Sequence, residues 1–158
     1  MKLARPLAAL VAAALAVAVA PSLARADTPI SCTVLEIAAS TTKEGGLAPE
    51  LKPLEKKLRK PPLSSWNTFK LLGRQSADLE PMKAATLKLA QGQAQVMIRD
   101  VDKAEGKKPR VGLSLQMDDP SGKRVLDTKL SVDAGDYVVI GRTLANNDGH
   151  LLAMSCKL

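Results

Sequence analysis

The chain has 158 residues, with 23 Lys and Arg against 16 Asp and Glu, and only two cysteines. This length favours a single domain. Trp, Tyr and Phe occur once each, so the core must be built from aliphatic side chains and methionine. The composition argues against a single-stranded nucleic-acid binder, because such proteins stack bases on aromatic rings.

The first 26 residues have the pattern of a secretory signal peptide. Lys2 and Arg5 precede an apolar run over residues 7–20, and residues 24–26 offer small side chains where signal peptidase reads them. A run of about 14 residues is too short for a transmembrane helix, which needs about 20. We therefore predict cleavage before Asp27, no transmembrane segment in the mature chain, and a periplasmic or secreted location.

Both cysteines, Cys32 and Cys156, lie in the part of the chain that is predicted to be exported. Two cysteines in an oxidising compartment usually pair. The chain has no Cys-x-x-Cys spacing, which would indicate a redox or metal-binding pair. We predict a structural disulfide that joins the two ends of the domain.

Residues 30–39 are rich in β-forming side chains and are predicted to be the first strand. After a polar loop, leucines recur at helical spacing at positions 47, 51, 54 and 58. This pattern predicts a short amphipathic helix that begins at about Leu51 or Pro53 and ends at Arg59, before Pro61 and Pro62.

Three strands are predicted in the middle of the chain, over residues 65–73, 82–89 and 93–101. Trp66 and Phe69 are three residues apart, so a regular strand would place them on opposite faces. Gln91 and Gly92 form a hairpin signal between the second and third of these strands.

The segment from Arg110 to the C-terminus has the clearest pattern. Residues 111–117 alternate strictly between apolar and polar, as in a strand with one buried face. Turn signals separate three further runs, at residues 125–132, 137–140 and 151–158, which predicts an antiparallel meander of four strands. In total the sequence predicts one domain, residues 27–158, that is mainly β: an antiparallel sandwich of about eight strands with one short amphipathic helix.

Catalytic motifs are not evident. The single histidine, His150, follows a turn and is expected to be solvated. The chain lacks Gly-x-Ser-x-Gly, His-Glu-x-x-His and phosphate-binding glycine loops, so we expect no cofactor, no metal site and no enzymatic activity. A carboxylate-dependent hydrolase is the alternative, which would use acidic pairs that lie beside turns: Asp100 with Asp102, Asp118 with Asp119, or Asp133 with Asp136.

Basic residues gather in two places. One group is on the polar face of the predicted helix and the other is in and beside a charged loop. If the fold brings them together, they could bind an anionic surface polysaccharide or lipid headgroups; otherwise they form a solvated face. The candidate anion-binding residues are Lys52, Lys56, Arg59, Lys60, Lys107, Lys108 and Arg110.

Four segments of the chain, residues 32–37, 51–63, 64–72 and 130–141, together resemble small exported proteins of soil and predatory bacteria. The resemblance covers most of the predicted mature chain. It includes no catalytic motif and therefore implies no activity.

The leading hypothesis from the sequence is an exported, non-enzymatic protein of the bacterial envelope that acts as a binding or structural module. Its partner would be an envelope protein or an anionic glycan, and we expect no nucleic-acid partner.

Overall fold

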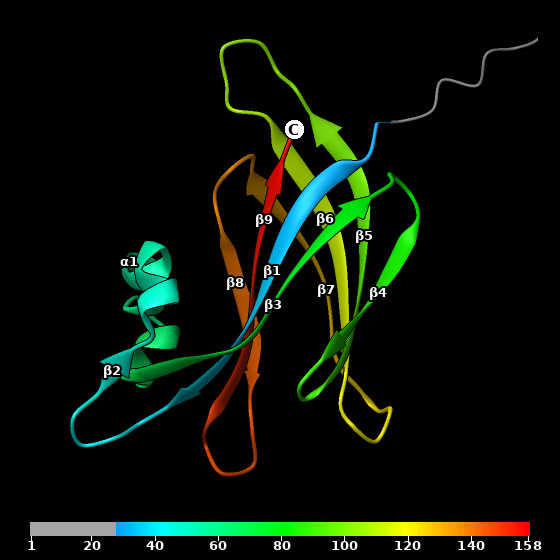
Figure 1. The fold of residues 1–158 in the computed structure, drawn as a ribbon. Coiled ribbons are helices and arrows are strands. Elements are labelled where there is room, and N and C mark those ends of the chain that lie inside the picture. Colours follow the sequence, from blue (N-terminus) through cyan, green and yellow to red (C-terminus); the bar gives the residue numbers. More distant parts are fainter. Residues whose placement is uncertain (1–27) are drawn as a thin grey trace, which may run out of the picture.

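The structure, a computed structural model, describes residues 28–158. The predicted signal peptide and its cleavage site lie outside these residues. In the described part, nine strands form two sheets (Figure 1). The strands are β1 (Ile30–Ser40), β2 (Gly46–Leu47), β3 (Thr68–Leu79), β4 (Ala84–Leu89), β5 (Gly92–Asp102), β6 (Arg110–Asp118), β7 (Arg124–Asp133), β8 (Val138–Thr143) and β9 (Gly149–Lys157).

The first sheet has the strand order β2-β3-β1-β9-β8, and the second sheet has the order β4-β5-β6-β7. All neighbouring strands are antiparallel except β2 and β3. The predicted antiparallel sandwich is therefore confirmed.

A helical segment, defined here as residues 49–65, lies between β2 and β3. It comprises a 3-10 helix η1 (Pro49–Leu54), the α-helix α1 (Glu55–Leu58) and a 3-10 turn η2 (Leu63–Ser65). The predicted helix is confirmed, but it ends one residue earlier and its first half is 3-10, with Pro53 inside it. A proline there has no N–H to donate to an α-helical bond. Three of the four predicted leucines are fully buried, at positions 51, 54 and 58, whereas Leu47 belongs to β2.

The molecule has three layers because the first sheet is covered on both faces. One face packs against the second sheet around Val34, Leu152 and Met154. The other face packs against the leucines of the helical segment through Leu35 and Ile37. This double coverage explains why every residue of β9 from Gly149 to Cys156 is buried.

The predicted four-strand meander is wrong at one connection. β6 and β7 pair in the second sheet, but β8 and β9 pair in the first. The turn between β7 and β8 carries the chain from one sheet to the other. Gly135, with φ of 80°, adopts the left-handed conformation that this turn needs, and its N–H donates to the carbonyl of Cys156 at 2.8 Å.

The sequence predicted that Trp66 and Phe69 lie on opposite faces of one strand, and this prediction is wrong. β3 begins only at Thr68, so Trp66 precedes it, and both rings pack in the cluster between the first sheet and the helical segment. The Trp66 indole Nε1–H donates to the Asn147 carbonyl at 2.8 Å. The start of β4 also differs from the prediction, which placed it at Met82. The strand begins at Ala84, and Met82 lies in an exposed turn with φ of 62°.

The predicted disulfide is confirmed. Cys32 of β1 and Cys156 of β9 are directly opposite each other, with their Cα atoms 4.0 Å apart, and both are buried. The bond joins the two ends of the described chain and suggests folding in an oxidising compartment. No helix within residues 28–158 is long and apolar enough to cross a membrane.

The prediction of a solvated His150 is wrong, because its side chain is fully buried. Its Nε2 lies 2.8 Å from Oε1 of Glu36, which is also buried. The Glu36 carboxylate accepts two more hydrogen bonds, from the N–H groups of Ala90 at 2.7 Å and Gln91 at 3.1 Å. Glu36 on the first sheet therefore fastens the β4–β5 turn of the second sheet.

Candidate functional site

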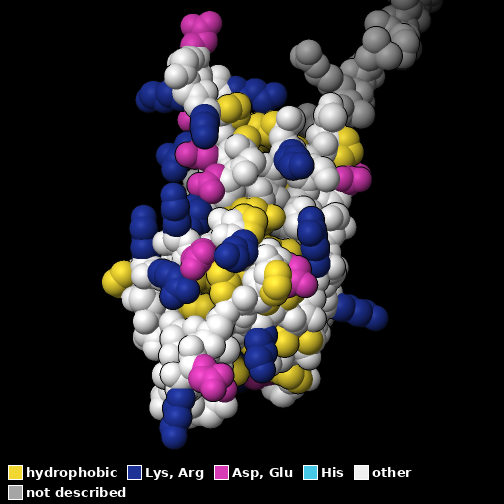
Figure 2. All heavy atoms as spheres, turned by 60° about the vertical axis from the view of Figure 1, so that its left-hand side comes forward, with side chains coloured by type: hydrophobic (Ala, Val, Ile, Leu, Met, Phe, Trp, Pro, Cys, Tyr) yellow, Lys and Arg dark blue, Asp and Glu magenta, His cyan; other side chains and the backbone are white. Residues whose placement is uncertain are grey.

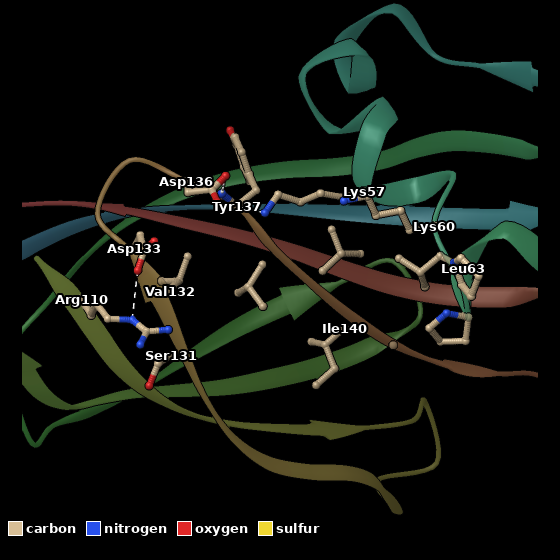
Figure 3. A pocket seen from close by; sticks show the side chains of 15 residues that line it. Lys57, Lys60, Leu63, Arg110, Ser131, Val132, Asp133, Asp136, Tyr137 and Ile140 are labelled. Carbon is tan, nitrogen blue, oxygen red and sulfur yellow. Dashed lines mark hydrogen bonds and ion pairs between the residues drawn. The ribbon is translucent and has the colours of Figure 1, made fainter. Parts of the chain in front are cut away.

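A cavity lies where the sandwich is open, between the edge strands β7 and β8 (Figure 3). Its volume is about 580 Å³. One wall comes from residues 131–133 of β7 with Arg110 of β6, and the other from the end of the helical segment at Lys57 and residues 60–63. We call this cavity the edge groove.

The floor of the edge groove is the free edge of β8. It is lined by Tyr137, which precedes the strand, and by the first four residues of β8, Val138 to Gly141. Successive side chains of a strand point to opposite faces of its sheet. Val138 and Ile140 pack toward the core between the sheets, while Tyr137 and Val139 pack toward the helical segment. A single cavity can contact both sets only if it runs along the edge of the strand.

Ion pairs close one end of the edge groove. Lys57 Nζ lies 2.9 Å from Asp136 Oδ2, and Arg110 Nε lies 3.0 Å from Asp133 Oδ1. Lys60, on the side of the groove where Ile140 lies, makes no ion pair within residues 28–158 (Figure 3). The groove therefore combines an apolar floor with one uncompensated ammonium group.

The hydrogen bond from Lys57 lowers the pKa of the Asp136 carboxyl below its ordinary value of 3.8, and the N–H of Tyr137 and the charge of Lys108 act in the same direction. A second carboxyl is that of Asp118, the last residue of β6. Its pKa is lowered mainly by a hydrogen bond from Arg124 and then by one from Gln93.

Stability should fall in acid for this reason. A carboxyl whose pKa is lowered in the folded state stabilises the fold above its ordinary pKa, here 3.8, and this contribution is lost as the pH falls through the lowered value. We expect the thermal midpoint of the native protein to drop below about pH 4, and to drop less steeply in the variant Asp118→Asn. Identical slopes for both proteins in a titration of the midpoint from neutral to strongly acidic pH would contradict this assignment.

The seven predicted anion-binding residues differ in their position relative to the edge groove. Of the seven, Lys60 and Arg110 line the edge groove. Arg59 pairs with Glu55 at 3.0 Å. The remaining four, Lys52, Lys56, Lys107 and Lys108, are exposed outside it. Figure 2 shows the same dispersal, with Lys and Arg side chains spread between apolar patches over this face.

The sequence analysis did not include Lys57 among the candidate site residues, and it did not identify the apolar part of the groove. The apolar part of the groove was visible in the sequence as the run Val138-Val139-Ile140. We predicted this run as a strand inside a meander, so nothing marked it as an exposed edge. The position of β8 at the end of the first sheet follows from the change of sheet after β7.

Acidic groups in the groove are already engaged. Asp133 and Asp136, one of the pairs considered for hydrolysis, both line the groove, but each pairs with a basic side chain. The buried acids of the described chain, Glu36 and Asp118, lie outside the groove. Within residues 28–158, no group of three or more His, Cys, Asp or Glu side chains is arranged to hold a metal ion.

Comparison with known proteins found no matching family model, no matching curated protein and no matching solved structure. The assignment of function therefore depends on the geometry of the edge groove.

Proposed function

We propose that the protein is an exported, non-enzymatic binding module of the bacterial envelope, and that the edge groove is its binding site. The observation that carries this proposal is the lining of one cavity by four consecutive residues of the edge strand β8, Val138 to Gly141, beside Lys60, which makes no ion pair within residues 28–158. Its volume, about 580 Å³, lies within the range of ligand-binding pockets.

Export is supported by the N-terminal pattern and by the disulfide between Cys32 and Cys156. A non-enzymatic role is supported by the pairing of both groove carboxylates with basic side chains, which removes them from proton transfer or nucleophilic attack. An apolar floor beside a single free ammonium favours a ligand that is largely apolar and carries a negative group.

A binding assay with three defined probes tests this proposal: vesicles of phosphatidylglycerol, soluble dextran sulfate, and the acetylated octapeptide Val-Val-Thr-Thr-Val-Val-Thr-Asp, which as a strand has valines on both faces and ends in aspartate. We expect at least one probe to bind. Ile140→Asp should weaken that binding about tenfold or more by placing a charge on the apolar floor. Ile140→Thr, which keeps a β-branched side chain, serves as a milder variant whose folding is safer.

Lysine variants distinguish binding in the edge groove from binding to a general basic surface. Lys60→Ser should weaken binding by about two- to fivefold, the usual range for an exposed charge pair. Lys52→Ser, which removes an equally exposed charge outside the groove, is the matched control and should have no effect. Equal losses in both lysine variants, with no effect of Ile140→Asp, would instead indicate the anion-recognising surface of the sequence analysis. Failure of all three probes to bind would also contradict the proposal.

A further inference from the structure

We propose that the edge groove takes an extended peptide segment, which adds to β8 as a sixth strand of the first sheet. The segment would have apolar side chains on both of its faces and an acidic residue near Lys60. This inference rests on the proposed function, because it names the class of ligand that the edge groove binds.

The backbone of β8 supplies the first argument. The N–H of Leu144 donates to the carbonyl of Asp148 at 2.7 Å, which fixes the alternation of the β8–β9 ladder. In an antiparallel pair, every second residue bonds to its neighbour and the residues between point outward. Val139, Gly141 and Thr143 therefore direct their N–H and C=O groups away from β9, and the first two of these line the groove.

Two of the three other sheet edges, β2 and β7, are protected in ways that β8 is not. β2 has only two residues. β7 carries four charged residues along its ten positions: Arg124, Asp127, Lys129 and Asp133. Short edges and charges prevent the pairing of exposed strands. β8 has neither along its apolar part, residues 138–140, so it is better suited than β2 or β7 to pair with another strand. At β4, the remaining edge, the Lys88 carbonyl already accepts a hydrogen bond from Gln75.

The walls of the groove fit the two faces of an added strand. Toward the second sheet, the wall presents Val132 beside Val138 and Ile140. Toward the helical segment, it presents Pro61 and Leu63 (Figure 3). Because the side chains of a strand alternate between faces, a peptide paired with β8 would place its residues alternately against these two apolar walls.

A lipid chain or a polysaccharide fits this arrangement less well. An acyl chain would cover the outward N–H groups of Val139 and Gly141 without accepting hydrogen bonds from them, which is costly. A polysaccharide would satisfy these groups but would not use the apolar walls. An extended peptide does both, and this is the usual basis of recognition by strand addition.

The charge of the groove adds one requirement. Lys57 and Arg110 are neutralised by Asp136 and Asp133, so the uncompensated charge is that of Lys60. An acidic side chain or a terminal carboxylate of the peptide would pair with it. The aspartate at the end of the valine–threonine octapeptide provides this group.

Backbone methylation of the octapeptide tests strand addition directly, because it removes N–H donors while keeping every side chain. Odd-numbered residues of a strand direct their N–H and C=O groups to one edge, and even-numbered residues direct theirs to the other. A peptide methylated at two residues of one parity keeps a free edge and should bind within about threefold of the parent. A peptide methylated along both edges should bind at least about tenfold more weakly.

The outcomes separate this inference from the proposed function. If the peptide methylated along both edges binds as tightly as the one-edge peptide, strand addition is overturned. The groove remains the site if Ile140→Asp still weakens that binding. Failure of the parent octapeptide to bind at millimolar concentration also overturns strand addition, and the vesicle and dextran sulfate assays then decide the proposed function.

Self-pairing of β8 is the competing occupant. Sedimentation of the free protein would reveal it as a dimer that dissociates in Val139→Pro, a change that removes an outward N–H and keeps the ladder to β9. We expect a monomer, and such a dimer would overturn the assignment to a peptide partner.

Discussion

Replacement of Glu36 by alanine should lower the free energy of unfolding by about 3 kcal/mol or more, because each of the three groups that lose a hydrogen-bond partner costs about 1–3 kcal/mol. The change leaves the fully buried ring of His150 without its partner at 2.8 Å. It also leaves the N–H groups of Ala90 and Gln91 without an acceptor. Urea denaturation of the oxidised protein measures the difference.

The matched control for this variant is Glu44→Ala, which removes an exposed carboxylate from the loop between β1 and β2. A surface change of this kind should alter stability by no more than about 0.5 kcal/mol. A loss below about 1 kcal/mol in Glu36→Ala would mean that the buried carboxylate does not fasten the two sheets. Glu36→Gln, which retains one acceptor oxygen, should lie between the two.

Loss of the disulfide is the second large effect that we expect. The double variant Cys32→Ala, Cys156→Ala should be less stable by about 2–5 kcal/mol, because the bond closes a loop across most of the domain. The two residues are 124 positions apart in the chain, which places the effect in the upper part of this range under the chain-entropy account.

The native protein should therefore respond to a reducing agent, whereas the double variant should not. Urea midpoints measured with and without dithiothreitol test this difference. We expect unchanged far-ultraviolet circular dichroism in the double variant, since β1 and β9 remain paired at nine positions. A loss of stability below about 1 kcal/mol would indicate that this strand pairing alone holds the two ends together.

The local patterns of the sequence predicted the elements of the fold well. Strict alternation over residues 111–117 corresponds to β6, and the leucine spacing corresponds to the face of the helical segment that docks on the first sheet. The cysteine count and the export signal predicted the disulfide. These features depend on neighbouring residues or on cysteine chemistry, which a sequence displays directly.

The position of an element in its sheet is a long-range property that local patterns do not contain. The turn around Gly135 looks like any other hairpin signal, yet it moves the chain between sheets and makes β8 an edge. His150 illustrates the same difficulty. It follows a turn, but it is the second residue of β9, a strand buried on both faces. Glu36 inside an apolar strand was the one sign of a buried partner.

The candidate site was predicted only in part for the same reason. Charge patterning identified Lys60 and Arg110, but it grouped them with Lys52 and Lys56, which lie outside the edge groove. Helical spacing places these lysines on one solvated face. It does not show that Lys57 and residues 60–63 line the edge groove while Lys52 and Lys56 do not.

Amide hydrogen exchange on β8 is the most direct test of the edge groove as a site for an added strand. With the octapeptide at saturation, the outward amides of Val139 and Gly141 should exchange at least about tenfold more slowly, as expected for newly hydrogen-bonded groups. Amides of β4, the edge of the other sheet farthest from β7, should be unchanged. Unaltered exchange at Val139 and Gly141 under the same conditions would contradict this account of the site.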